Sequence, residues 1–212
     1  MTSMATTTIL AIDPATCTGF CIFERMGTQV RVVKCGAFLV DTTSSFQGDH
    51  MLSMRTELEA VLDAVKDPIE MVHIETFFFS KKFCQGADEN LILRGAVYQR
   101  LREANIPYTL HGPTQWKKFI VGHVRPTKAE IEKHGKTKAP KSIVVDALKS
   151  KFDIVMSSST ALAQRGKSKR VQFKFDVSDA IGIGLYGIMS DTPQCTILPY
   201  RPPDQIVVQL GI

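Results

Sequence analysis

The sequence predicts a single α/β domain in which helices flank a five-stranded mixed sheet. Three strand-like runs follow one another between residues 7 and 40, which predicts an antiparallel meander. Two later strand-like runs alternate with helical patterns, which is typical of an α/β architecture. The chain has 212 residues, 44% of them hydrophobic and 22% charged, so it is long enough to bury one sizeable core.

The N-terminal hairpin places an acid at its tip. Residues 7–23 read TTILAIDPATCTGFCIF, in which Thr7–Ile12 predicts a buried strand and Gly19–Phe23 its returning partner. Asp13 ends the first strand, and Pro14 favours an extended backbone at the residue before it. Taken alone, Asp13 also fits the role of a turn cap.

The next elements follow from hydrophobic periodicity. Val30–Val40 predicts the third strand, and Ser44–Val65 predicts a helix with one apolar stripe. Ile69–Thr76 predicts the fourth strand. Glu75, near its end, is again an acid that closes an apolar run.

The second half of the chain continues the alternation. Predicted elements are, in order, a helix at Glu89–Glu103, a strand at Ile106–Leu110, a short helix capped by Thr114 that runs to Val121, and helices at Lys141–Phe152 and Asp176–Met189. The connecting segments are expected to be irregular. His123–Pro140 is expected to have at most one helical turn, and Met156–Phe175 to be a loop that is either disordered or ordered by nucleic acid. Cys195–Ile212 is expected to be an extended arm that ends in a short strand at Gln205–Leu210.

The five cysteines fit neither a disulfide framework nor a zinc pattern. Their number is odd and no CxxC occurs among Cys17, Cys21, Cys35, Cys84 and Cys195. Buried, reduced thiols are expected, which suits a reducing intracellular compartment: the cytoplasm of a bacterium or an infected host cell, or an organelle. A metal site at Cys17 and Cys21 is the alternative. The sequence shows neither a secretory signal nor an apolar run of the roughly 20 residues that span a bilayer, so no membrane partner is expected.

The net charge of +5 conceals a basic middle. Residues 117–174 carry 15 basic and 4 acidic side chains, whereas residues 1–116 and 175–212 each have a net charge of −3. A basic segment between acidic flanks is typical of a protein that binds a polyanion. A solvated lysine-rich loop without a ligand is the alternative.

Four carboxylates occupy positions that suit metal binding. Asp13 and Glu75 end apolar strands, while Asp176 and Asp179 lie three residues apart on one predicted helix and share a face. Acids beside an apolar core repel one another unless a cation neutralises them. Hard oxygen ligands at this density suit Mg²⁺ or Mn²⁺, and two such ions about 4 Å apart can promote hydrolysis of a phosphodiester bond.

An aromatic and basic stretch directly follows Glu75. Phe77–Phe79 precedes Lys81 and Lys82, and aromatic rings beside cations suit stacked bases and phosphates. The alternative is that some of these rings complete the core. The other expected phosphate contacts lie in the basic middle: Lys117, Lys118 and Lys141.

Four motifs, in this order, resemble those of RuvC-type Holliday junction resolvases of the ribonuclease H-like superfamily. They are ILAIDPATCTGF, HIETFFFSKK, GPTQWKKFIVG and DVSDAIGIGLYG, and together they span most of Thr7–Met189. The resemblance implies a ribonuclease H-like fold and a homodimer that cuts four-way DNA junctions with divalent metal. It also implies site roles for individual residues: catalysis and metal binding by Asp13, Glu75, Asp176 and Asp179, and a base contact by Phe78.

The chain departs from the bacterial pattern of that family. Ala11 and Ala15 stand where the bacterial motif has glycines, the stretch between Val121 and Asp176 is longer and more basic, and a C-terminal arm is added. These features resemble a viral, phage or organellar branch. We therefore expect a nuclease domain over residues 1–192, with a basic insertion at about 122–174, and an extended arm over residues 193–212.

Three other functions remain open at the level of sequence. Another ribonuclease H-like nuclease would cut flaps, branched DNA or RNA–DNA hybrids, but in classical ribonuclease H the glutamate lies on a helix, whereas Glu75 follows an alternating strand. An actin-like ATPase also begins with an Asp-containing hairpin, but it needs a second domain for which 212 residues leave no room. A non-enzymatic DNA-binding module accounts for the basic middle and leaves the four acids unexplained.

Overall fold

In the part of the chain that the structure describes, the core is a six-stranded mixed sheet in the order β5-β4-β1-β2-β3-β6. The computed structural model describes residues 6–76, 87–156 and 173–200. The first three strands form the predicted antiparallel meander, β4 runs parallel to β1, and β5 runs parallel to β4. The strands are β1 (Thr6–Asp13), β2 (Cys17–Met26), β3 (Gln29–Leu39), β4 (Ile69–Glu75), β5 (Tyr108–His111) and β6 (Thr196–Ile197).

The predicted α/β fold is confirmed, with one strand more than the sequence indicated. β6 pairs in parallel with the start of β3, where the Thr196 amide donates to the Thr28 carbonyl at 2.7 Å and the Leu198 amide to the Val30 carbonyl at 2.8 Å. A two-residue strand has no hydrophobic alternation, so periodicity could not have revealed it.

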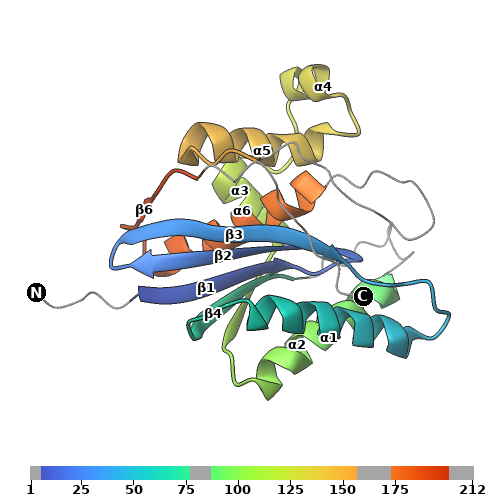
Figure 1. The fold of residues 1–212 in the computed structure, drawn as a ribbon. Helices are drawn as coiled ribbons and strands as arrows, with labels where there is room; N and C mark the ends of the chain where they lie inside the picture. Colours follow the sequence, from blue (N-terminus) through green and yellow to red (C-terminus); the bar gives the residue numbers. More distant parts are fainter. Residues whose placement is uncertain (1–5, 77–86, 157–172, 201–212) are drawn as a thin grey trace, which may run out of the picture.

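Helices cover both faces of the sheet (Figure 1). On one face lie α1 (Gln47–Asp63) and α2 (Ala87–Glu103); on the other lie α3 (Pro113–Val121), α5 (Ala139–Phe152) and α6 (Phe173–Asp191). The remaining helix, α4 (Lys128–His134), lies outside α5 and away from the sheet.

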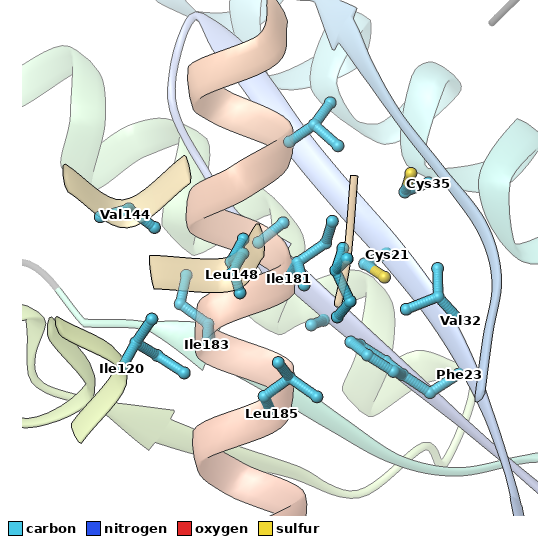
Figure 2. Close-up of a cluster of buried hydrophobic side chains, with 14 of the residues drawn as sticks. Cys21, Phe23, Val32, Cys35, Ile120, Val144, Leu148, Ile181, Ile183 and Leu185 are labelled. Carbon is cyan, nitrogen blue, oxygen red and sulfur yellow. The ribbon is translucent and has the colours of Figure 1, made fainter. Parts of the chain in front are cut away.

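Each face of the sheet has its own hydrophobic core, because successive side chains of a strand point in opposite directions. In β1, Leu10 and Ile12 pack with residues of α1 and α2, whereas Ile9 and Ala11 pack with residues of α3, α5 and α6. Figure 2 shows the second core, with Ile181 and other α6 side chains among those of the sheet, α3 and α5.

Helix α6 approaches the sheet closely. A β-carbon at Gly184 would overlap the Phe23 ring, and one at Gly187 would overlap the His73 imidazole. Each glycine lowers helix propensity by about 1 kcal/mol relative to alanine, and the close packing of α6 on the sheet offsets that cost. The glycines of this helix therefore serve tertiary packing.

The prediction for residues 123–140, an irregular segment with at most one helical turn, is wrong. Seven of these residues form α4, which begins with a capping box. The Glu130 amide donates to Thr127 Oγ1 at 3.3 Å, and the Thr127 amide donates to Glu130 Oε2 at 2.7 Å. Lys133 and His134 then pair with Asp146 of α5. The basic composition of the segment obscured a T-x-x-E capping signature that the sequence contains.

Several boundaries also differ from the sequence predictions. α6 begins at Phe173, so the end of the loop predicted at Met156–Phe175 is helical, and its residues 157–172 lie outside the described part. The short helix begins at Pro113 with Gly112, not Thr114, as its N-cap, because the Gln115 side chain accepts a hydrogen bond from the Gly112 amide. The strand predicted at Gln205–Leu210 lies outside the described residues, and the domain division stays a prediction.

The cysteines of the described residues are free thiols: Cys17, Cys21, Cys35 and Cys195. Cys84 lies outside those residues, and the reducing compartment stays a prediction. Among the helices that the structure describes, none combines the length and the apolar character needed to cross a membrane.

Candidate active site

Asp13 and Glu75 lie side by side at the carboxyl ends of two neighbouring parallel strands. β1 and β4 pair with Ile12 opposite Ile74, so the next residue of each strand reaches the same edge of the sheet. Burial raises the pKa of Asp13, and so do the negative charge of Glu75 and a hydrogen bond between the two carboxyl groups. Carboxylates in contact repel each other unless a proton or a cation is shared between them.

Helix α6 brings two further acids to this edge. Gly19 pairs with Asp13 across β1 and β2, and a β-carbon at residue 19 would overlap the backbone carbonyl of Asp176. The missing side chain at Gly19 therefore lets the beginning of α6 lie against the end of the hairpin. Asp179 consequently comes within electrostatic reach of both Asp13 and Asp176.

Asp179 is buried without a complete set of hydrogen bonds. Asp179 is only 7% exposed, and its Oδ1 atom has no hydrogen-bond partner within the described part of the chain. The pKa of Asp179 is raised to about 7: burial is the largest cause, the charges of Asp13 and Asp176 add to the rise, and those of Lys117 and Lys141 oppose it. A buried acceptor without a donor is costly, and a cation would satisfy it.

Asp176 is held between a lysine and a thiol. Lys141 Nζ lies 3.3 Å from its Oδ1, and Cys17 Sγ donates to its Oδ2 at 3.1 Å. Burial alone lowers the pKa of Lys141, but the charges of Asp176, Asp179 and Asp13 outweigh it and the net shift is upward. Burial and Asp176 raise the pKa of Cys17, so its thiol stays protonated. Cys17 thus acts as a hydrogen-bond donor here.

Glu75 is oriented by two residues that sequence reasoning did not assign to the site. The indole Nε1 of Trp116 donates to Glu75 Oε1 at 2.9 Å, and Arg94 Nη2 lies 3.7 Å from Oε2. Arg94 Nη1 also donates to the Glu75 backbone carbonyl. Both partners belong to helices, α2 and α3, that pack beside the end of β4.

The structure brings two of the predicted phosphate-binding residues to the acids. Lys141 contacts Asp176, and the charge of Lys117 lowers the pKa of Asp13 and of Asp179 in opposition to burial. Lys118 is exposed on α3. Phe78, Lys81 and Lys82 lie outside the described residues.

The oxygens of the four acids are the candidate ligands for a metal ion at this site. In residues 6–76, 87–156 and 173–200, no three His, Cys, Asp or Glu side chains are placed so that they could hold one. Instead Arg94 and Lys141 supply positive charge to Glu75 and Asp176. The donor set nevertheless fits a hard divalent cation, because it consists of carboxylate oxygens and includes the buried Oδ1 of Asp179.

Comparisons with known proteins identify the family of this chain. The family model described as "Crossover junction endodeoxyribonuclease RuvC" matches residues 9–139. A RuvC of Sorangium cellulosum is 31% identical over 124 residues, 58% of this chain and 67% of the relative. One of Acidovorax is 29% identical over 129 residues, 58% of this chain and 68% of the relative.

Solved structures share the fold over a longer stretch. Thermus thermophilus RuvC superposes with a TM-score of 0.55 at 19% identity, covering 89% of this chain and 98% of that one. The same protein in complex with Holliday junction substrate gives 0.56 at 18% identity, over 87% and 94% of the two chains. The yeast mitochondrial Holliday junction resolvase gives 0.51 at 17% identity, over 88% and 79%.

The fold is the predicted ribonuclease H-like fold, shared with Thermus thermophilus RuvC and the yeast mitochondrial resolvase. The chain belongs to the RuvC family of crossover junction endodeoxyribonucleases, whose chemistry depends on metal. The family match includes Asp13 and Glu75 and ends at residue 139, before Asp176 and Asp179. Assignment of the two acids of α6 therefore rests on their place in the fold.

Proposed function

We propose that this protein is a metal-dependent endonuclease that resolves four-way DNA junctions by hydrolysing phosphodiester bonds. The observation that carries the proposal is the meeting of Asp13, Glu75 and the two acids of α6 at one edge of the sheet, in a chain of the RuvC family. Acids gathered beside a hydrophobic core cost folding free energy, and a catalytic role accounts for their presence.

The four acids are proposed to hold two Mg²⁺ ions in each active site, with Mn²⁺ as a substitute. The chemistry that bound cations supply here is activation of a water molecule and stabilisation of the leaving oxygen. The remaining groups prepare the site: Trp116 and Arg94 orient Glu75, and Lys141 holds Asp176. Lys117 and Lys141 also bring positive charge to the place where a scissile phosphate would meet the acids.

DNA contacts are proposed from two parts of the chain. Lys117, Lys118 and Lys141 contact phosphates from α3 and α5. The residues that follow Glu75 in the sequence contribute an aromatic ring that stacks on bases at the junction centre, and two further phosphate contacts. These residues are Phe78, Lys81 and Lys82.

A two-fold homodimer is the proposed assembly, because two cuts on opposite strands require two active sites. Helix α2, the interface that the family resemblance implies, carries Leu91, 41% exposed, and Gly95 one turn later, with open space around the position of its missing side chain. These two positions would let a second α2 approach closely. Light scattering of the junction-bound protein tests the assembly, and a mass of one protomer would contradict it.

The function is tested by comparing substrates of matched sequence: a four-way junction, a flap, a linear duplex and an RNA–DNA hybrid, each with Mg²⁺ and with EDTA. The proposal predicts Mg²⁺-dependent cleavage that is much faster on the junction. Equal cleavage of flaps or hybrids would favour another ribonuclease H-like nuclease. Junction binding without cleavage of any substrate would favour a DNA-binding module.

A further inference from the structure

Trp116 connects the core of the protein to the acidic site. Its side chain is fully buried, with 0% exposure, yet its indole N–H reaches Glu75 Oε1 at 2.9 Å. A β-carbon at Gly182 of α6 would lie 2.8 Å from the Trp116 ring, so the indole fills a space that only glycine leaves on that helix. The Lys117 Nζ atom lies over the Trp116 ring, 4.9 Å from the ring centroid.

We propose that Trp116 is a positioning residue that holds the Glu75 carboxylate ready for a divalent cation. A glutamate at a strand end has several accessible rotamers, and a fixed N–H on one oxygen restricts them. The packing of the indole against α6 fixes that N–H in turn. Hydrogen bonds of this kind orient a ligating carboxylate, and the loss of one typically costs about 10–100-fold in metal affinity or activity.

The chemistry of indole suits this role better than that of a charged partner. An arginine or lysine at the same distance would neutralise Glu75 and compete with a cation for it. The indole N–H is a neutral donor, so it orients Oε1 without adding a positive charge beside it. Arg94 Nη2 lies farther than the indole N–H from the Glu75 carboxylate, at 3.7 Å from Oε2.

The sequence provides an internal probe of this contact. Trp116 is the one tryptophan in the 212-residue chain. All tryptophan fluorescence of the protein therefore comes from the indole that is hydrogen-bonded to Glu75. The proposal predicts that Mg²⁺ changes this emission, and that the change saturates over the same concentration range as ion binding measured by calorimetry. Unchanged emission at saturating Mg²⁺ would contradict it.

The decisive variant is Trp116→Phe, which keeps an aromatic ring in the core and removes the N–H donor. The control is Ile120→Val, which changes the same core one turn later on α3, where Ile120 is also 0% exposed. We expect Trp116→Phe to weaken Mg²⁺ binding about tenfold and to lower kcat by roughly 10–100-fold. Junction affinity in EDTA should change less than about twofold, since Trp116 is not expected to touch DNA. Ile120→Val should bind Mg²⁺ like the wild type.

A double-variant cycle separates positioning from general loosening of the core. If Trp116 acts through Glu75, then Trp116→Phe should not weaken Mg²⁺ binding further in a protein that already carries Glu75→Ala. Equal losses in both backgrounds, or unchanged Mg²⁺ affinity in Trp116→Phe, would overturn the inference. This inference rests on the proposed metal-dependent function, and the wild-type titration distinguishes the two: absence of Mg²⁺ binding by the wild type contradicts the function itself.

Discussion

Gly19 of β2 lies against the backbone carbonyl of Asp176 at the start of α6, so closely that a β-carbon at residue 19 would overlap it. Gly19 also pairs with Asp13 across the hairpin. One residue without a side chain therefore sets the distance between the acid at the end of β1 and the acids of α6. The separate elements of the site depend on this contact.

Gly19→Ala should impair both folding and catalysis. The added methyl group meets backbone atoms, which cannot rotate away, so α6 must shift; overpacking of this kind costs about 1–3 kcal/mol. We expect a lower melting temperature together with a strong loss of junction cleavage. A Gly19→Ala protein that cleaves at the wild-type rate would show that α6 need not lie this close to the hairpin.

Asp179 should make metal-free stability fall as pH rises. Its pKa is about 7 in the folded protein against an ordinary value of 3.8. Because the folded state favours the protonated form, the stabilisation is complete below about pH 3.8 and is lost as pH rises to about 7. In EDTA at pH 8, Asp179→Asn should therefore be more stable than the wild type, by up to roughly 4 kcal/mol.

Thermal unfolding with and without Mg²⁺ tests this prediction. Mg²⁺ should stabilise the wild type and leave Asp179→Asn largely unaffected, because the variant lacks one proposed ligand charge. Asp191→Asn, at the exposed far end of the same helix, is the control and should resemble the wild type. An Asp179→Asn protein that is less stable than the wild type in EDTA at pH 8 would contradict the account.

The buried pair of His73 and His111 predicts a loss of stability in acid. Their ring nitrogens Nδ1 and Nε2 lie 2.9 Å apart, and burial lowers the pKa of His73 from 6.5 to about 4, with the nearby His111 and Arg25 adding to the shift. The folded state favours neutral His73, so its contribution is complete above about pH 6.5 and is lost as pH falls towards 4. The loss is roughly 3 kcal/mol.

Unfolding of Asp179→Asn and of the double variant Asp179→Asn/His73→Gln between pH 4 and 7 measures this effect. Asp179→Asn is present in both proteins because Asp179 titrates in the same range with the opposite sign. The expected result is a weaker dependence on pH in the double variant. Identical pH profiles would show that the histidine pair is not responsible.

The four acids could be selected from the sequence because each has a distinctive place in a local pattern. Asp13 and Glu75 close apolar strands, and Asp176 and Asp179 recur at helical spacing. Their partners were not predictable in the same way. Trp116 occupies an apolar position of a short helix and has the appearance of an ordinary core residue. Which face of that helix meets the end of β4 depends on tertiary packing, which periodicity does not encode.

The DNA contacts of the basic middle should appear in the salt dependence of binding. Each lost phosphate contact lowers the slope of log affinity against log salt by about 0.9. Glutamine substitutions at Lys117, Lys118 and Lys141 should therefore lower it by about 2.7 together. The control is Lys66→Gln. Lys66 is exposed and lies just before the start of β4, whereas Glu75 lies at the other end of that strand. An unchanged slope in the triple variant would show that these lysines are only solvated.

The central claim is that the acids are required for DNA cleavage and not for DNA binding. The variant Asp176→Asn tests this claim most directly. Junction binding and junction cleavage are measured on one preparation, binding in EDTA and cleavage in Mg²⁺, with Asp191→Asn as the matched control. Because the substitution removes a negative charge beside the DNA, the account predicts binding equal to or tighter than that of the wild type, with cleavage abolished. Cleavage at the wild-type rate by a folded Asp176→Asn protein would contradict it.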